Sequence, residues 1–162
     1  MATKSPIPNA FAFLICIAIP IGIGFFVSSI TIDSIKTWYI TLNKPSFNPP
    51  NWVFAPVWTT LYVLMGVASY RVWYRRKAVD GFKYAAIIYF IQLILNFSWS
   101  LIFFEMRQIG LALIEIVLLL FAILFNGFIF YRFDKLAGWL FVPYFLWACF
   151  ATYLTYTIFI LN

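Results

Sequence analysis

Five long apolar stretches, separated by short polar segments, dominate the sequence. About twenty apolar residues are needed to cross the hydrocarbon core of a bilayer, and each stretch is close to that length. The pattern therefore predicts a single all-α domain over residues 1–162, an integral membrane bundle of five transmembrane helices. The expected spans are residues 9–30, 56–74, 82–104, 109–130 and 136–160.

The first span contains Pro20, Gly22 and Gly24. Proline inside a helix removes a backbone hydrogen bond, and glycine lets a neighbouring backbone come close. These residues predict either a kink or a close helix–helix approach. A third interpretation, that they leave room for a ligand, remains open.

The segment between the first two spans, residues 31–55, differs from the rest of the chain. Four prolines fall between residues 45 and 56, together with asparagines and large aromatic residues. Proline fixes φ and disfavours helix in the residue before it, so the pattern predicts no helix before Pro56. We expect a long structured loop that caps an internal pocket. A short interfacial turn near its start would be anchored by Trp38 and Tyr39.

Composition places this chain in lipid rather than water. It is 65% hydrophobic and 10% charged, whereas a soluble domain is about half apolar and about a quarter charged. The chain has no histidine, which excludes imidazole ligation of haem or zinc and histidine acid–base chemistry. Its two cysteines, Cys16 and Cys149, lie inside apolar stretches and predict neither a disulfide framework nor a metal site.

The basic residues lie at span boundaries and are divided unequally between the two sides. This arrangement sets topology and does not form the clustered surface that a nucleic acid requires. By the positive-inside rule, we expect a cytoplasmic N-terminus, with the first loop and the C-terminus on the opposite side. One side carries Lys4, Arg71, Arg75, Arg76, Lys77, Lys83, Arg132 and Lys135, and the other carries Lys36, Lys44 and Arg107.

A polar residue stands in the middle of the third span. Asn96 is followed by Trp99 and Phe103 at spacings that place all three on one helix face. An amide beside an indole can hydrogen-bond to a planar ligand and stack on it. The alternative, a hydrogen bond from Asn96 to another helix, has equal standing on the sequence alone.

Two further spans carry aromatic faces with the same periodicity. In the fifth span, the small residue Ala151 lies between larger neighbours and leaves a notch, which serves either ligand binding or helix packing. Three such faces together predict one mostly apolar pocket with a few polar groups. The two additional faces are Trp58, Tyr62 and Met65 in the second span, and Trp147, Ala151 and Leu154 in the fifth.

Ordinary hydrolytic or group-transfer catalysis is not expected. The sequence shows no paired carboxylates, no nucleophile with a base and no glycine-rich phosphate loop. Glu115 is the only acid well inside a span, and it is predicted to snorkel, to be neutral, or to bond to a neighbouring helix. We expect no cofactor or metal.

A set of residues from about Trp38 to the end follows the pattern of a known family. These residues are Trp38-Tyr39, Lys44 to Phe47, Pro49-Pro50, Trp52-Val53, Pro56 to Trp58, Leu61-Tyr62, Met65-Gly66, Ser69-Tyr70, Gln92, Asn96, Trp99, Phe103-Phe104, Arg107-Gln108, Gly110, Pro143-Tyr144, Trp147 and Leu154. With them the chain resembles the translocator protein family, also called tryptophan-rich sensory proteins or peripheral-type benzodiazepine receptors (TspO/MBR).

The resemblance implies a five-helix bundle, often a homodimer, whose first loop caps a pocket for tetrapyrroles such as protoporphyrin IX. Family members also bind isoquinoline carboxamide and benzodiazepine-type drugs, and animal members bind cholesterol. Trp58 and Trp147 match tryptophans linked to light-dependent porphyrin breakdown. By position, Asn96, Trp99, Ala151 and Leu154 match pocket residues, and Trp38, Pro45 and Trp52 match residues near the lid.

The last span departs from the family pattern. The cholesterol-recognition motif requires an apolar residue, a tyrosine and then a basic residue; Leu154 and Tyr156 are present, but no Lys or Arg follows them. Thr155 stands where asparagine is usual, and Leu111 replaces a tryptophan of animal members. Sterol binding through this weak motif is not expected. These differences favour a bacterial-type member in the plasma membrane.

Three functions remain open on the sequence. The first is a membrane binding protein for porphyrins and related flat hydrophobic ligands, acting in tetrapyrrole homeostasis or stress sensing. The second is a light- and oxygen-dependent porphyrin-degrading enzyme that uses Trp58 and Trp147. The third is a transporter of tetrapyrroles or sterols.

Overall fold

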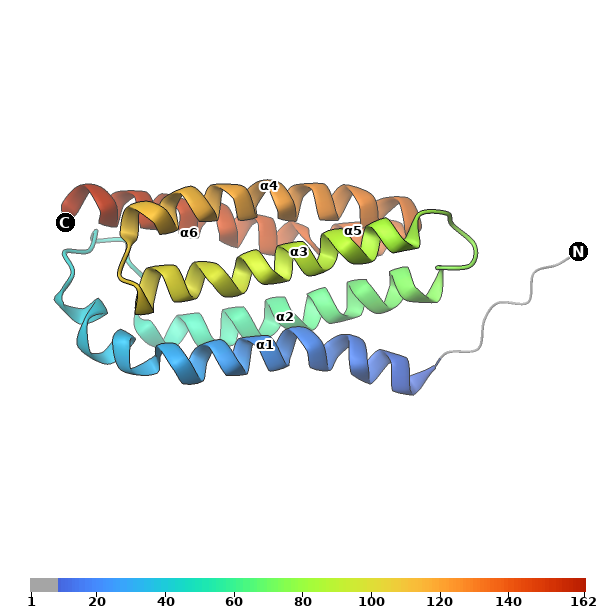
Figure 1. Ribbon diagram of the computed structural model, residues 1–162, viewed down its shortest axis with the longest axis horizontal. Coiled ribbons are helices and arrows are strands. Elements are labelled where there is room, and N and C mark those ends of the chain that lie inside the picture. Colours follow the sequence, from blue (N-terminus) through green and yellow to red (C-terminus); the bar gives the residue numbers. More distant parts are fainter. Residues whose placement is uncertain (1–8) are drawn as a thin grey trace, which may run out of the picture.

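Five long helices run along the molecule, and the computed structural model describes residues 9–162 (Figure 1). A turn of 3-10 helix (η1), a π-helical turn (η2) and a short helix (α5) lie between them. The elements are α1 (Ala10–Thr37), η1 (Tyr39–Thr41), α2 (Asn51–Tyr74), α3 (Phe82–Ser100), η2 (Leu101–Glu105), α4 (Ile109–Phe133), α5 (Lys135–Trp139) and α6 (Val142–Leu161).

The outer surface of the bundle is suited to lipid. Within residues 9–162, five helical segments are long and apolar enough to cross a membrane. Large apolar side chains point outward, among them Phe25, which is 78% exposed, and Phe11, which is 72% exposed. A soluble monomer does not leave so much apolar surface in water. The predicted all-α class with five spans is confirmed.

Successive long helices run in opposite directions and close into a ring. α1 packs against α2 and against the α3–η2 segment, α3 packs against α4, and α4 packs against α6. α2 packs mainly against α1 and α5 and makes few contacts with α6. The ring is therefore closed only loosely between α2 and α6. The interior between these helices is filled by a cluster that includes Leu61, Met65, Leu93, Ile116 and Tyr144.

Glycines allow α1 and α2 to approach each other closely. A Cβ atom on Gly66 would lie 2.6 Å from the backbone Cα of Ile17, and one on Gly24 would overlap the ring of Tyr62. The expected close approach is therefore confirmed at Gly24. Gly22 faces open space, since a Cβ atom added there would have nothing within 4 Å.

The first helix is longer than expected. α1 continues to Thr37 instead of ending at residue 30, so most of the expected interfacial turn is helical. No proline or glycine interrupts residues 31–37, and the hydroxyls of Thr31 and Thr37 donate to the carbonyls of Val27 and Asp33. A short turn does follow at Tyr39–Thr41.

The prediction that no helix forms before Pro56 is wrong. α2 begins at Asn51, with Pro50 as its N-cap and Pro56 inside it. Pro56 is the sixth residue of α2, just past the four N–H groups that lack a partner within a helix. It removes the one bond that its N–H would have made to the carbonyl of Trp52, and the helix continues through it. The first turn is held by the Val53 N–H, which donates to the Pro50 carbonyl at 2.9 Å.

The fifth span consists of two helices rather than one. α5 ends at Trp139 and α6 begins at Val142. Pro143 is the second residue of α6 and has no N–H to donate to the carbonyl of Trp139, so it fits the first turn of a new helix and not the interior of a continuous one. A tight turn follows the third span: η2 ends at Glu105, and Arg107 adopts a left-handed φ of 55°.

The two ends of the bundle differ in charge. Arg71, Arg75, Arg132 and Lys135 lie near the end where α2 and α4 finish, and Lys36 and Arg107 lie near the opposite end (Figure 1). Lys4, which the sequence assigns to the first group, lies outside the described residues. Which end faces the cytoplasm stays a prediction.

Candidate functional site

A hollow of about 600 Å³ lies along the loosely closed seam between α2 and α6. Its walls are apolar apart from the Thr60 hydroxyl and the Trp147 indole. Two prolines help to form it, one from each helix. The lining residues are Pro56, Val57, Thr60, Leu61, Leu64, Pro143, Leu146, Trp147 and Phe150.

Trp147 is the one predicted site residue that lines this hollow. Its ring packs edge-on against Phe54 of α2 at 5.9 Å and lies 5.4 Å from Phe150. Its indole Nε1 is buried and has no acceptor among the described residues. A buried donor without a partner costs about 1–3 kcal/mol. This indole therefore gains from any ligand atom that can accept its hydrogen bond.

Beside the hollow, polar side chains from three helices form a buried hydrogen-bond network. The Tyr62 hydroxyl of α2 donates to Asn96 Oδ1 of α3 at 2.9 Å. Asn96 Nδ2 donates to the Tyr144 hydroxyl of α6, also at 2.9 Å. Asn96 thus bonds to two other helices, as the alternative interpretation expected. Its role toward a ligand stays a prediction.

Trp58 packs against this network. Its ring stacks on Tyr62 with centroids 5.6 Å apart and meets Tyr144 edge-on at 6.2 Å. Trp58 and Trp147 are both only partly buried, and both pack against the central core cluster. Trp58 does not line the hollow, so the two tryptophans occupy different surroundings. Porphyrin breakdown through this pair stays a prediction.

A second aromatic cluster lies toward the end of the bundle that carries the first loop. Phe103, in the π-helical turn η2, is 2% exposed. It stacks on Trp99 at 5.4 Å and meets Trp38 edge-on at 5.6 Å. Trp99 packs against both the central cluster and this one, and its Nε1 is also buried without an acceptor in residues 9–162.

The remaining predicted residues of the fifth span face inward. Ala151 packs against the central cluster together with Trp147. Leu154 is buried in the second cluster beside Tyr39 and Phe103. Tyr156, the other half of the incomplete sterol motif, is 49% exposed and points away from this interior.

The first loop is held in place by specific contacts at the same end. Lys44 Nζ donates to the carbonyl of Leu42 at 3.1 Å and to that of Tyr39, and it lies over the Tyr39 ring. The Asn43 N–H donates to Asn162 Oδ1 at 2.9 Å, which joins the loop to the end of α6. Phe47 stacks on Tyr153 of the same helix at 5.2 Å.

The two predicted lid residues in this region differ in exposure. Pro45 is half-buried and its carbonyl accepts from the Asn48 N–H, whereas Trp52 is 74% exposed at the start of α2. The hollow between α2 and α6 is lined by no residue of the loop before α2. A lid over an enclosed pocket therefore stays a prediction.

Several residues of this site were not singled out as pocket residues from the sequence. Tyr144 completes the buried network, and Thr60 lines the hollow. The feature of the sequence that could have indicated this hollow is the pair of prolines, Pro56 and Pro143, near the starts of α2 and α6. Glu115, whose role was open, is buried on α4 and accepts from the Ser98 hydroxyl of α3 at 3.1 Å. Within residues 9–162, no group of three metal-ligating side chains lies together.

Fold and site together define an integral membrane protein of five long helices, with an apolar hollow that Trp147 helps to line and a buried polar network. The sequence pattern of the TspO/MBR family matches residues 16–161, and this chain belongs to that family.

Named relatives are similar over most of their length. The tryptophan-rich protein TspO of Chlorobaculum tepidum is 40% identical over 91% of this chain and 94% of its own. The translocator protein of Homo sapiens is 42% identical over 75% of this chain and 72% of its own. The tryptophan-rich sensory protein of Cereibacter sphaeroides is 39% identical over 77% of both chains.

Proposed function

We propose that this protein is a membrane-embedded binding protein for porphyrins, protoporphyrin IX among them, and for related flat hydrophobic ligands. The observation that carries the proposal is the hollow of about 600 Å³ with Trp147 in its wall. Ligand sites are typically about 300–1,000 Å³ in volume and mostly apolar, with a few polar groups. This hollow has both properties.

The chemistry of the walls favours a flat, largely apolar ligand with hydrogen-bond acceptors. Rings such as those of Trp147 and Phe150 offer stacking surfaces, and aromatic pairs add about 0.5–1.5 kcal/mol beyond the area they bury. The buried N–H donor of Trp147 lacks an acceptor within the described chain. A small rotation of an indole toward a ligand nitrogen or carboxylate would satisfy its donor.

We assign ligand binding to residues of α2, α3, η2 and α6, together with Trp38 and Pro45 from the segment that follows α1. Of these, Trp147 lines the hollow, Tyr62 and Asn96 bond to each other in the buried network, and the second aromatic cluster lies toward the first loop. The full set is Trp38, Pro45, Trp52, Trp58, Tyr62, Asn96, Trp99, Phe103, Trp147, Ala151 and Leu154.

The biological role that fits such a protein is tetrapyrrole homeostasis or stress sensing at a bacterial plasma membrane, as a homodimer. Relatives named sensory protein and translocator protein support sensing and transport respectively. Uptake of labelled porphyrin into proteoliposomes separates the two. Equilibrium binding without uptake assigns this chain to binding and sensing.

The hollow is tested by filling it. Thr60 and Thr59 are neighbouring exposed residues of α2, and each hydroxyl bonds to the carbonyl four residues earlier. Only Thr60 lines the hollow. We expect Thr60→Phe to raise the Kd for protoporphyrin IX by about tenfold or more, which is about 1.4 kcal/mol. The matched control Thr59→Phe should leave the Kd within about twofold.

The measurement is the shift in porphyrin absorbance on titration of the purified protein in detergent, since this signal does not depend on any tryptophan. Equal affinities for the two variants would remove the hollow from the ligand site. An absence of saturable binding to the wild-type protein would overturn the proposal itself.

A further inference from the structure

A second hollow, of about 540 Å³, lies at the opposite end of the bundle from the first loop. It is formed where α2 ends and where α4 passes into α5. Unlike the first hollow, its wall is rich in cations. The lining residues are Arg71, Arg75, Tyr131, Arg132, Phe133, Asp134, Lys135 and Leu136.

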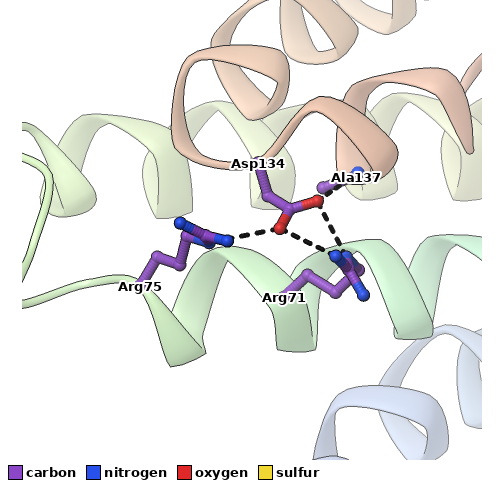
Figure 2. Close-up of polar contacts among 4 residues, drawn as sticks. All are labelled: Arg71, Arg75, Asp134 and Ala137. Atoms are coloured by element: carbon purple, nitrogen blue, oxygen red, sulfur yellow. Dashed lines mark hydrogen bonds and ion pairs between the residues drawn. The ribbon is translucent and has the colours of Figure 1, made fainter. Parts of the chain in front are cut away.

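One buried carboxylate positions two of these cations. Arg71 pairs with Asp134 in a bidentate arrangement, Nε to Oδ1 and Nη2 to Oδ2, both at 2.8 Å (Figure 2). Arg75 Nε reaches Oδ2 of the same carboxylate at 3.2 Å. Asp134 Oδ1 also accepts from the Ala137 N–H and caps α5 (Figure 2). The guanidinium groups are therefore held in fixed positions rather than free to extend separately into solvent.

The hollow keeps a large excess of positive charge. Four basic side chains line it against a single carboxylate, which is already used by Arg71 and Arg75. Arg132 and Lys135 are exposed and form no ion pair within residues 9–162. Fixed arginines beside unpaired cations are the groups that bind phosphate most readily in proteins.

An apolar stripe leads from this hollow along the outside of α4. Phe121, Leu124, Phe128 and Tyr131 follow one another at helical spacing and are 64%, 40%, 65% and 43% exposed. Ten residues of α-helix extend about 15 Å, which is half of the hydrocarbon core of about 30 Å. The stripe therefore has the length of one leaflet, and Tyr131 belongs to both the stripe and the hollow.

We propose that this hollow binds the phosphate headgroup of an anionic phospholipid, whose acyl chain lies along the stripe on α4. Basic pockets between transmembrane helices recognise such headgroups. A phospholipid alone presents a phosphate and a long apolar chain at the required separation. Nucleic acid or an acidic peptide would leave the stripe unused. The proposal does not depend on porphyrin binding.

Native mass spectrometry of the full-length protein tests the assignment, with dioleoyl phosphatidylglycerol, dioleoyl phosphatidylcholine and inorganic phosphate as probes. We expect one phosphatidylglycerol molecule to bind more tightly than phosphatidylcholine. The double variant Arg132→Gln/Lys135→Gln should bind it about 25-fold more weakly, which is roughly fivefold for each cation removed. Neither residue carries an ion pair in the described chain, so we expect the variant to fold normally.

The matched control is Lys77→Gln/Lys83→Gln. Both lysines are exposed at the same end of the bundle, and neither lines the hollow. Each double variant removes two positive charges, so the two variants change the net charge equally. Unchanged lipid binding in this control supports a specific site. An equal loss in both double variants would show attraction by surface charge only and overturn the proposal. The proposal would also be overturned if inorganic phosphate displaced phosphatidylglycerol as effectively as unlabelled phosphatidylglycerol does. A protein dimer without bound lipid in the spectra would overturn it as well.

Discussion

At the scale of single residues, Asp134 has the most constrained environment of the charged groups described above. Burial raises the pKa of its carboxyl. The hydrogen bonds from Arg71 and from the Ala137 N–H, with the charges of Arg71 and Arg75, outweigh burial and hold the pKa below its usual value. The ionised form is therefore the one that the folded protein stabilises.

This sign fixes the pH dependence of stability. A carboxyl with a lowered pKa in the folded state stabilises the fold above its unfolded pKa of about 3.9, and the contribution is lost as the pH falls below that value. We expect Asp134→Asn to lower the free energy of unfolding by about 1–3 kcal/mol at neutral pH. Below about pH 4, the gap between variant and wild type should narrow.

Asparagine caps helices about as well as aspartate, so this variant removes the charge and spares the α5 cap. Thermal unfolding of the purified protein in detergent at a series of pH values measures the effect. Asp80→Asn is the control, because Asp80 is exposed at the same end of the bundle and forms no ion pair within residues 9–162. A constant difference between Asp134→Asn and wild type at all pH values would contradict the account.

Asn96 shows what a single residue reveals in a sequence and what it does not. A polar amide in the middle of an apolar span predicted a buried hydrogen-bonding role. The structure supplies its partners, Tyr62 and Tyr144, which are 34 and 48 residues away in sequence. Such distant partners depend on how three helices are arranged, which periodicity within one helix does not contain.

At the scale of elements, the contact between α1 and α2 depends on glycine. A side chain at Gly66 would meet the backbone of α1, at Ile17 Cα and at the Cys16 carbonyl oxygen, and a backbone cannot rotate away. We expect Gly66→Ala to lower the free energy of unfolding by about 1–3 kcal/mol, as overpacking does.

Gly22→Ala is the matched control for this contact. It lies on α1 with nothing within 4 Å of the added Cβ atom, so the better helix propensity of alanine should leave stability unchanged or raise it by up to about 1 kcal/mol. Thermal unfolding in detergent compares the two variants. If both alanines had the same effect on the unfolding temperature, close packing of α1 on α2 at Gly66 would not determine the stability of the protein.

The existence of the five transmembrane helices could be predicted from the sequence, whereas several of the residues at which helices begin or end could not. Five apolar stretches of membrane length predicted the five spans, since hydrophobic length is imposed by the bilayer itself. The start of α2 was missed because proline was treated as a barrier at any position. Pro56 lies in the second turn of α2, where its missing N–H removes one bond and the helix continues through it. Pro143, by contrast, does mark the break between α5 and α6.

At the scale of the whole molecule, the candidate site was predictable in part. The predicted faces of α2, α3 and α6 do turn toward a common interior, where Trp58, Trp99 and Trp147 pack against one core cluster. The hollow itself lies at the seam between α2 and α6. Its position follows from which helices pack closely and which do not, and the sequence of each helix alone does not determine that.

The two hollows of the bundle differ in chemistry. The hollow along the α2–α6 seam is apolar, and the hollow where α4 meets α5 is cationic. Lipid that surrounds the bundle has access to both. Their separation means that a variant of one should leave the other intact.

A crystal structure of the protein with protoporphyrin IX bound would show whether the hollow between α2 and α6 is the porphyrin site. We expect the macrocycle between α2 and α6, in contact with Trp147 and beside Thr60, with an acceptor within hydrogen-bond distance of the Trp147 indole nitrogen. A macrocycle bound elsewhere, with the α2–α6 hollow closed by its own side chains, would rule this site out.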